Sequence, residues 1–302
     1  SKKASPLQYD VKVPIVYDVA GKVPREYLPY RSSSSDGSVS MSPLVDQSDF
    51  YKGTYEHIAK DSFPFAYYHH EKSSRNFAPK TSSPGSDWIS WTIDPLLDRS
   101  NRYIRRYNKS SQDGEIFFWD VDVNNGLPHA SGEYEDATLY TNVSVDEEDH
   151  AVIEFVDKLG QTILKRVQAV QAPNMTTYTP GEWADTYYVH DDFGNLRYVL
   201  PPEAVVEMGS PSTFPYAPSP TLLARWAFHY HYDGRRRMTE KKVPGAEPVY
   251  MVYDDRDRMV LTQDGNQRTT GEWLFTKYDA LNRPIASGKY ADDSDHQAMQ
   301  QK

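Results

Sequence analysis

Two pairs of adjacent carboxylates are the first candidates for chemistry in this sequence, Asp191 with Asp192 and Asp254 with Asp255. A glycoside hydrolase uses two carboxylates that flank its substrate, and one of them needs a raised pKa to act as an acid. Both pairs lie inside a recurring turn motif that accounts for them without any substrate. We therefore expect no catalytic residues and no enzyme activity, and a glycoside hydrolase is the least favoured function.

A candidate calcium site begins at Asp120, where Asp and Asn alternate with Val. A calcium loop of this type needs Gly at its sixth position and a bidentate Glu at its twelfth. Asn125 and Ser131 stand at those positions instead. A type I′ hairpin turn at Asn125–Gly126, after a strand over residues 116–123, explains the same residues. The sequence therefore favours a turn over a calcium site.

Imidazole side chains form a second candidate metal site. His229 and His231 would point to one face of a strand, and His69 and His70 add two more imidazoles, a donor type that binds transition metals. No third ligand stands at a diagnostic spacing from any of them, and the surface of a strand explains them more simply. We expect no metal ion and no cofactor.

Nucleophilic catalysis has no support, because the sequence contains no Cys and no Gly-x-Ser-x-Gly motif. The main alternative to a structural role is a carbohydrate-binding surface, since Trp side chains offer flat platforms for sugar rings. Trp also fills the cores of β proteins, so only an exposed, stacked row would favour binding. The six Trp residues are Trp88, Trp91, Trp119, Trp183, Trp226 and Trp273.

One short motif recurs along the chain and predicts hairpins. Each copy has an extended stretch, an Asp, two variable residues, a fourth residue that is usually Gly, Asn or Asp, and a second extended stretch. Asp at the start of a type I turn accepts backbone N–H bonds, and the fourth position favours positive φ. Each copy should form a hairpin with a tight, bulged turn. The first and fourth positions are Asp18 and Gly21, Asp157 and Gly160, Asp191 and Gly194, Asp233 and Arg236, Asp254 and Asp257, and Asp279 and Asn282.

The residues around the motif favour strands with one apolar face. Trp226, Phe228, Tyr230 and Tyr232 alternate with smaller or polar residues, a period-2 pattern. The aromatic residue before the Asp should therefore pack, as proposed for Tyr17, Tyr232, Tyr253 and Tyr278. Arg236 departs from the pattern, because a long side chain is disfavoured in the left-handed region, so its unit is expected to be strained or to turn differently.

Bulk composition agrees with a β fold and restricts the partners. The 302 residues include 23 Tyr and 21 Pro, which favours short strands joined by turns. A net charge of −10 disfavours nucleic acid and anionic membranes as partners. The one dense basic run, Arg235–Arg237, is interpreted as a solvated hairpin end. No apolar run approaches the roughly 20 residues that cross a bilayer.

The distribution of the motif divides the chain. We expect an irregular β region at residues 1–150, which includes the first copy, a repeat array at 151–290 and a disordered tail at 291–302. The first region holds a Ser-rich linker at 32–40 and no clear copy between Asp18 and Asp157. Residues 201–220 are interpreted as an irregular insertion. The predicted fold class is all-β, with repeat-derived antiparallel hairpins that form an open, curved sheet.

The motif copies resemble the YD repeats of the RHS, teneurin and Tc-toxin families. Residues 188–202 and 232–248 are especially similar to RHS proteins of Bacteroidetes, and residues 17–30 resemble the N-terminal domain of unknown function that precedes their repeats. The resemblance implies part of a β-shell that encloses a C-terminal toxin or effector. The sequence lacks the RHS core signature, with its aspartyl self-cleavage site, and a variable toxin module.

Taken together, the residues and the resemblance lead us to expect a non-enzymatic structural scaffold, a wall segment of such a shell. The expected partners are the remainder of the same polypeptide and its cargo, with glycans as a further candidate and with no nucleic acid and no membrane insertion. The resemblance implies a secreted bacterial protein that is extracellular or on the cell surface. A carbohydrate-binding adhesin module is the alternative function.

Overall fold

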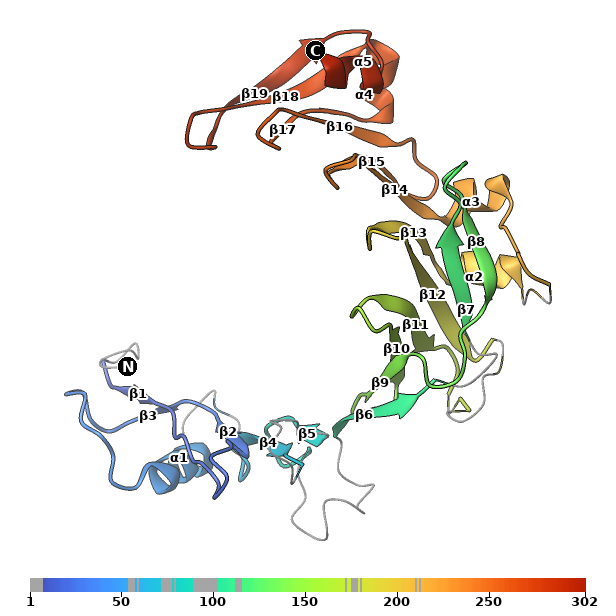
Figure 1. The fold of residues 1–302 in the computed structure, drawn as a ribbon. Coiled ribbons are helices and arrows are strands. Elements are labelled where there is room, and N and C mark those ends of the chain that lie inside the picture. Colours follow the sequence, from blue (N-terminus) through green and yellow to red (C-terminus); the bar gives the residue numbers. More distant parts are fainter. Residues whose placement is uncertain are drawn as a thin grey trace. The chain divides into compact units, whose positions relative to one another are not determined.

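The structure is a computed structural model, and antiparallel strands dominate it (Figure 1). Fifteen of the strands hydrogen-bond in one open antiparallel sheet, which confirms the predicted all-β class. The order of strands in this sheet is β19-β18-β17-β16-β15-β14-β13-β12-β11-β10-β9-β6-β5-β4-β2. The structure describes residues 8–53, 58, 60–71, 78, 80–88, 103–111, 116–171, 173–174, 179, 181–209, 211 and 213–302.

The chain divides into two compact units, residues 1–108 with 142–152 and residues 109–141 with 153–302. This division differs from the predicted boundary at residue 150. Residues 109–141 belong to the second unit because the hairpin they contain packs on a strand there: the rings of Phe117 and Trp119 lie 6.0 and 5.8 Å from the ring of Tyr187. The sequence did not predict this contact, because the hairpin and Tyr187 lie far apart along the chain.

The first unit is built from short strands and one helix. Its elements are β1 (Val11–Lys12), β2 (Arg25–Tyr27), β3 (Tyr30–Arg31), α1 (Pro43–Lys52), β4 (Phe65–His69), β5 (Lys80–Ser82) and most of β6 (Ile104–Ser110). Tyr27 and Phe65 are buried with ring centroids 5.4 Å apart. The buried side chain of Gln47 joins α1 to the strands, because its Nε2 donates to Leu28 O and Pro64 O. A buried amide is stable only with such partners.

The second unit contains the repeat array. Strands β9 (Tyr140–Val145) and β10 (Ala151–Val156) contribute residues to both units. The other elements are β7 (Phe117–Val121), β8 (Pro128–Glu133), β11 (Thr162–Gln168), β12 (Trp183–His190), β13 (Leu196–Leu200), α2 (Pro202–Met208), α3 (Pro220–Trp226), β14 (Phe228–Tyr232), β15 (Met238–Lys242), β16 (Val249–Tyr253), β17 (Met259–Gln263), α4 (Gly265–Thr270), β18 (Glu272–Tyr278), β19 (Pro284–Ala291) and α5 (His296–Gln301).

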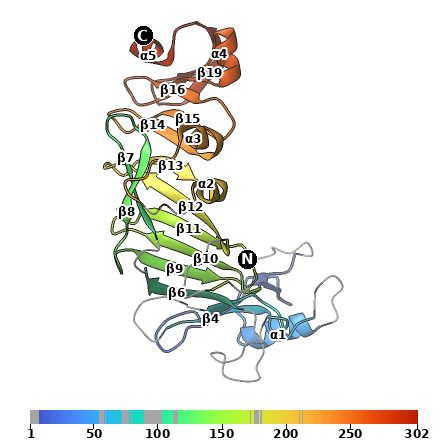
Figure 2. The ribbon, with the colours of Figure 1, turned by 90° about the vertical axis from the view of Figure 1, so that its right-hand side faces the viewer.

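One face of the sheet in this unit is covered. Along β12 every second side chain is buried, beginning with Trp183, as expected for a strand with one packed face. The β7–β8 hairpin and the helices α2 and α3 lie on the same side of the strands (Figure 1), and Figure 2 shows the two helices beside β12 to β15. The buried pair Arg166 and Asp185, joined at 2.9 and 3.0 Å, also ties β11 to β12.

Two helices correct the sequence-based expectations around residues 201–226. The supposed irregular insertion contains α2, which begins at Pro202, a residue suited to a first helical turn, and buries Ala204. Trp226 ends α3 and does not share the face of β14. The Ser219 hydroxyl accepts the Leu222 N–H at 3.2 Å and caps the start of α3. At its other end the Ala227 N–H donates to Leu223 O at 3.0 Å, so the helix extends to Trp226.

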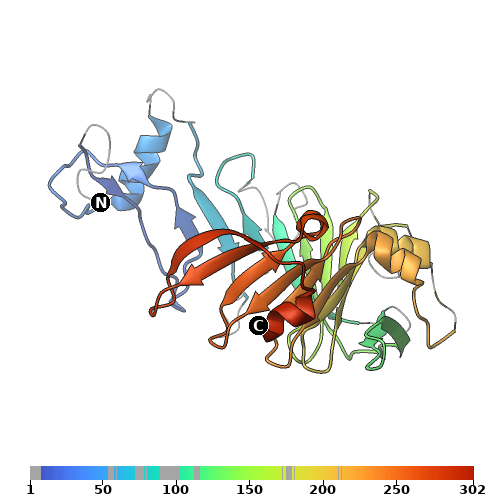
Figure 3. The same ribbon diagram turned by 90° about the horizontal axis from the view of Figure 1, so that it is seen from above.

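The C-terminal segment is ordered, so the predicted disordered tail at 291–302 is wrong. Asp295 caps α5 by accepting the Ala298 N–H at 2.8 Å, and Met299 is buried beside Val252 and Trp273. Figure 3 shows α5 and the neighbouring C-terminal strands from above. Burial of one Met anchors a helix too short to be stable alone. In the part of the chain that the structure describes, no helix has the length and apolar character needed to span a membrane.

Candidate functional site

The six predicted turns share one hydrogen-bond pattern. At Asp191, the backbone N–H donates to Asn195 O at 3.0 Å, and the Gly194 N–H donates back to Asp191 O at 2.8 Å. Asp191 Oδ1 accepts the N–H groups of Phe193 and Asn195 at 3.1 and 2.9 Å. The turns at the other five Asp residues contain the same four bonds. Each Asp carboxylate therefore closes its own turn.

The fourth residue of each of these turns lies in the left-handed region. The φ angle ranges from 61° at Arg236 and Asp257, through 62° at Asn282, to 82° at Gly160. Arg236 keeps the same geometry as the others, with its N–H donating to Asp233 O at 2.9 Å. The expectation that this unit turns differently is therefore wrong. The turn tolerates the left-handed backbone of Arg236, although a long side chain is disfavoured there.

A seventh turn of the same kind was missed by the sequence analysis. Asp146 N–H donates to His150 O, its Oδ1 accepts the N–H groups of Glu148 and His150, and Asp149 has a φ of 67°. The turn joins β9 to β10. Val145 stands where the motif has an aromatic residue. Only Asp146 and Asp149, at the first and fourth positions, then indicate the motif in the sequence.

Five of the turns lie along one edge of the second unit. In Figure 1 the tips of the hairpins β10–β11, β12–β13, β14–β15, β16–β17 and β18–β19 follow one another along one side of the strands. Side chains join consecutive turns: Gln161 Nε2 donates to Gly194 O at 3.4 Å, and Arg236 Nε donates to Asn195 Oδ1 at 3.0 Å. The turns therefore form a continuous series.

In two of the three later turns, the Arg at the fifth position binds both its own turn and the next. Arg237 donates to Asp233 and also reaches Asp254 O at 3.2 Å and Asp257 Oδ1 at 2.8 Å. Arg258 repeats this arrangement on Asp254, Asp279 O and Asn282 Oδ1. Such charge-assisted bonds are stronger than neutral ones. We call each such set of contacts from Arg237 or Arg258 to the following turn a clasp.

Each clasp includes the repeat tyrosine of the following unit. The guanidinium of Arg237 lies 4.8 Å from the ring centroid of Tyr253, and that of Arg258 lies 5.1 Å from the ring of Tyr278, within cation–π range. The hydroxyl groups of these tyrosines donate to the preceding unit, Tyr253 to Met238 O at 2.8 Å and Tyr278 to Met259 O at 3.0 Å. The tyrosines are therefore packing residues that join hairpins.

Two expectations about the motif side chains need correction. Tyr17 is 64% exposed and does not pack as proposed, while Tyr232 is half-buried in β14. The basic run is not simply solvated: Arg237 is only 17% exposed, and Arg235 pairs with Asp257 at 2.9 Å. Asp257, on the neighbouring hairpin, pairs with both Arg235 and Arg237.

Three of the turn carboxylates, those of Asp233, Asp254 and Asp279, have lowered pKa values, unlike the acid of a glycosidase. At Asp254, partial burial raises the pKa, but hydrogen bonds from the Arg258 side chain and from backbone N–H groups outweigh it, so the net shift is downward. The pKa of Asp233 is lowered in the same way. The neighbouring Asp192 and Asp255 are exposed. The carboxylates of Asp233 and Asp254 therefore stabilise their turns in the charged form and are poor proton donors at neutral pH.

The candidate calcium segment forms the turn between β7 and β8. Asp122 Oδ1 accepts the Asn124 N–H at 2.8 Å, and the Gly126 N–H donates to Asp122 O at 2.7 Å. Only Gly126 of the pair Asn125–Gly126 has positive φ, so the turn is not type I′, which requires positive φ at both central residues. The Asp122 carboxylate sets this longer turn.

The structure adds a third potential ligand to the candidate histidine pair. One ligand atom from each of His229, His231 and Glu240 lies within 4.8 Å of the others, and the three side chains are partly buried. Among the described residues, the fold brings three potential metal ligands together at this one place. Glu240 lies on the neighbouring strand, opposite His231, so no sequence spacing could indicate it.

The Trp residues give little support to a glycan-binding surface. Trp119, Trp183 and Trp273 are buried, whereas Trp88 and Trp226 are half-buried. Trp226 Nε1 donates to Glu207 Oε2 at 2.6 Å. Trp91 lies outside the described residues. The described Trp side chains therefore form no exposed row.

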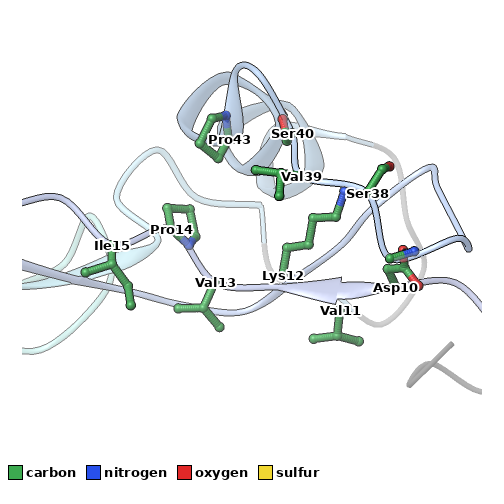
Figure 4. A pocket seen from close by; sticks show the side chains of 11 residues that line it. Asp10, Val11, Lys12, Val13, Pro14, Ile15, Ser38, Val39, Ser40 and Pro43 are labelled. Carbon is green, nitrogen blue, oxygen red and sulfur yellow. The ribbon is translucent and has the colours of Figure 1, made fainter. Parts of the chain in front are cut away.

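The first unit has a groove of about 610 Å³ between β1 and the start of α1 (Figure 4). Its charged lining residues are Asp10 and Lys12. Asp10 Oδ2 accepts the Gly37 N–H at 2.7 Å, and Lys12 Nζ donates to the Ser34 hydroxyl at 3.0 Å. These bonds hold the Ser-rich segment against β1. Both charged residues of the groove are therefore engaged in holding this loop in place.

Comparison with known proteins identifies the fold. Residues 1–94 match a family described as a domain of unknown function, DUF6443, and no curated protein matches the chain. The crystal structure of TcdB2-TccC3-TEV matches with a TM-score of 0.53 and 13% identity over 95% of this chain and 11% of that one. That of TcdB2-TccC3 matches with a TM-score of 0.52 and 14% identity over 93% and 10%. The fold of this chain is therefore similar to part of the TcdB2-TccC3 structure. This chain spans about a tenth of those chains.

Proposed function

We propose that this chain is a non-enzymatic structural scaffold, a wall segment of an RHS or YD-repeat shell. The observation that carries the proposal is the pair of clasps. Arg237 and Arg258 bind the following turn, and Tyr253 and Tyr278 bind the preceding hairpin. The Asp254 and Asp279 carboxylates close their own turns. Side chains that hold consecutive hairpins together are what a continuous wall requires, whereas a catalytic site requires uncommitted groups facing a cleft.

The proposed partners are the remainder of the same polypeptide and a C-terminal toxin or effector that the wall encloses. The similar structures include TcdB2-TccC3-Cdc42 and TcdB2-TccC3 without its hypervariable C-terminal region, each with a TM-score of 0.50. By analogy with those chains, a variable segment would follow the wall. A secreted, extracellular or cell-surface location agrees with this role. Analogy of fold supports the proposal but does not assign function by itself.

Limited proteolysis of the natural polypeptide that carries this chain tests the proposal. An enclosed C-terminal segment should resist protease while the wall is intact and become cleavable in the double variant Arg237→Met/Arg258→Met. Arg256→Met is the matched control, because Arg256 is exposed at the third position of the same turn, and it should leave protection unchanged. A C-terminal segment cleaved equally fast in all three proteins would contradict enclosure.

The absence of enzyme activity is part of the proposal and has its own test. The chain should show no turnover of glycoside or peptide substrates, because the Asp191 and Asp254 carboxylates accept bonds from their own turns. Cleavage that is lost in Asp254→Asn while the fold survives would overturn this point. Binding on a glycan array would instead favour the adhesin alternative.

A further inference from the structure

Three side chains with metal-binding atoms meet on one face of the β14–β15 hairpin. His229 and His231 are two residues apart on β14, so both point to the same side of the strand. In the antiparallel pairing with β15, His231 stands opposite Glu240, and His229 stands opposite Lys242. The ligand atoms of the two histidines and Glu240 lie within 4.8 Å of one another. The pairing register alone creates this cluster.

The two imidazoles are in a state suited to coordination. His229 Nε2 is buried and has no hydrogen-bond partner, which is costly for a polar atom. Burial lowers the pKa of His229 to about 4, with the neighbouring His231, Arg197 and Lys242 adding to the effect. Burial also lowers the pKa of His231, although Glu240 opposes the shift. These shifts favour the neutral form of both rings, which is the form that binds metal ions.

We propose that His229, His231 and Glu240 bind a divalent transition-metal ion of the zinc type. Two imidazoles and one carboxylate form a common zinc donor set, with bonds of about 2.0 to 2.2 Å and a fourth position for water. Tetrahedral bonds of this length place ligand atoms about 3.4 Å apart. Small side-chain rotations would close the cluster to that distance. The ion would pin β14 to β15, whether or not the chain forms a shell.

A hydrogen bond from Arg197 to His231 would compete with metal binding. Arg197 Nη2 donates to His231 Nδ1 at 3.3 Å, and the same side chain donates through Nε to Tyr230 O at 3.0 Å. Arg197 and Lys242 also place positive charge near the cluster. A ring coordinated through Nε2 carries its proton on Nδ1, and coordination through Nδ1 occupies that atom, so the bond from Arg197 to His231 is lost on binding in either case. Removing the guanidinium should therefore strengthen metal binding.

Titration of the untagged chain with Zn²⁺ at pH 7.5, followed by calorimetry, tests the site. We expect one equivalent to bind and to raise the unfolding temperature, since a ligand specific for the folded state stabilises it. Co²⁺ should give the visible spectrum of a tetrahedral site. Glu240→Gln and His231→Gln should each weaken binding at least about tenfold, with their folding checked by circular dichroism. His150→Gln, which alters a histidine with a 60% exposed side chain, is the control and should bind as before.

The variant Arg197→Gln should change the Zn²⁺ affinity in the opposite direction. It should bind Zn²⁺ several-fold more tightly than the natural chain, an increase that nonspecific binding to surface carboxylates would not show. The proposal is overturned if neither the natural chain nor Arg197→Gln takes up one equivalent of Zn²⁺. It is also overturned if Glu240→Gln and His231→Gln, both folded, bind as tightly as the natural chain.

Discussion

The early and late turns of the second unit solve the same backbone problem with different side chains. The turns at Asp157 and Asp191 place Gly at the fourth position and an amide, Gln161 or Asn195, at the fifth. The three later turns place Arg236, Asp257 and Asn282 at the fourth position, all with positive φ, and Arg at the fifth. The backbone hydrogen bonds are the same in both groups. The difference therefore lies in what the turns do to one another.

In two of the late turns the strained fourth residue serves as an acceptor. Asp257 Oδ1 accepts from Arg237, and Asn282 Oδ1 accepts from Arg258. Asp and Asn tolerate the left-handed region better than other side chains, and each offers an oxygen that Gly lacks. At Gly194, by contrast, a Cβ would lie 2.5 Å from Gln161 Nε2. A clasp therefore needs an acceptor side chain at the fourth position, where the early turns have Gly.

The largest effect should come from Gly194→Val. The φ of 77° at this position is strained for a β-branched residue, and the new side chain would displace Gln161 from Gly194 O. We expect a loss of about 2 to 3 kcal/mol in the free energy of unfolding, measured by urea denaturation.

Gly160→Val is the matched control for that substitution. Gly160 has a φ of 82°, but no atom lies within 4 Å of its Cβ position. This variant should show the backbone strain alone, about 0.5 kcal/mol less than Gly194→Val. If either variant is neutral, the left-handed geometry of the fourth turn position is incorrect.

The next largest effect should come from Arg258→Met. This change removes the bonds to Asp279 O and Asn282 and the contact with the Tyr278 ring, while retaining much of the aliphatic volume. Because the side chain is only 20% exposed, we expect a loss of about 2 kcal/mol.

Arg283→Met makes the same change at the equivalent position of the last turn. Arg283 is 71% exposed and bonds its own Asp279, so the expected loss is about 0.5 kcal/mol or less. Equal losses for Arg258→Met and Arg283→Met would mean that the bond within each turn, and not the clasp, is the important contact.

The sequence predicted what depends on local chemistry. Asp at the first position and Gly or Asn at the fourth determine a turn from within a few residues, so Asp157, Asp191 and Asp279 lie in the turns expected of them. The clasps were not predicted, although Arg recurs at the fifth position as Arg237, Arg258 and Arg283. Their targets belong to the next hairpin, whose distance along the edge depends on strand pairing.

Two further features that the sequence did not predict have the same origin. Glu240 joins His231 only through the β14–β15 register, and α5 is stabilised by Met299 packing beside Trp273. Both involve contacts across strands or between distant segments. The turn at Asp146 was missed for a different reason, because its flanking residue Val145 lacks the aromatic signature.

Acid should weaken the late turns through their carboxylates. The pKa of Asp254 is lower in the folded chain than in the unfolded chain, where it is about 3.9, so the unfolded state binds more protons in this range. The stabilisation is complete above the unfolded pKa and is lost as the pH falls through the folded pKa. Asp254→Asn should therefore lose less stability than the natural chain between pH 5 and pH 3, measured by urea midpoints. Parallel pH profiles for the two proteins would refute the assignment.

The smallest effect should come from Arg236→Gly. Relief of left-handed strain is worth about 1 kcal/mol, but greater entropy of the unfolded chain offsets much of it, and the bond to Asn195 Oδ1 is lost. We expect a net change within about 0.5 kcal/mol in thermal or urea unfolding. A strong destabilisation would show that the contact with the early turn matters more than the backbone strain.

The most direct test of the clasps is a double-mutant cycle between Arg258 and Asn282. Asn282→Gly removes the acceptor without adding strain, because Gly adopts the φ of 62° freely, and Arg258→Met removes the donor. If Arg258 joins consecutive hairpins through Asn282, the two changes should be non-additive by about 1 kcal/mol in the free energy of unfolding. Additivity to within about 0.3 kcal/mol would contradict the central claim that the late turns are held to one another by their side chains.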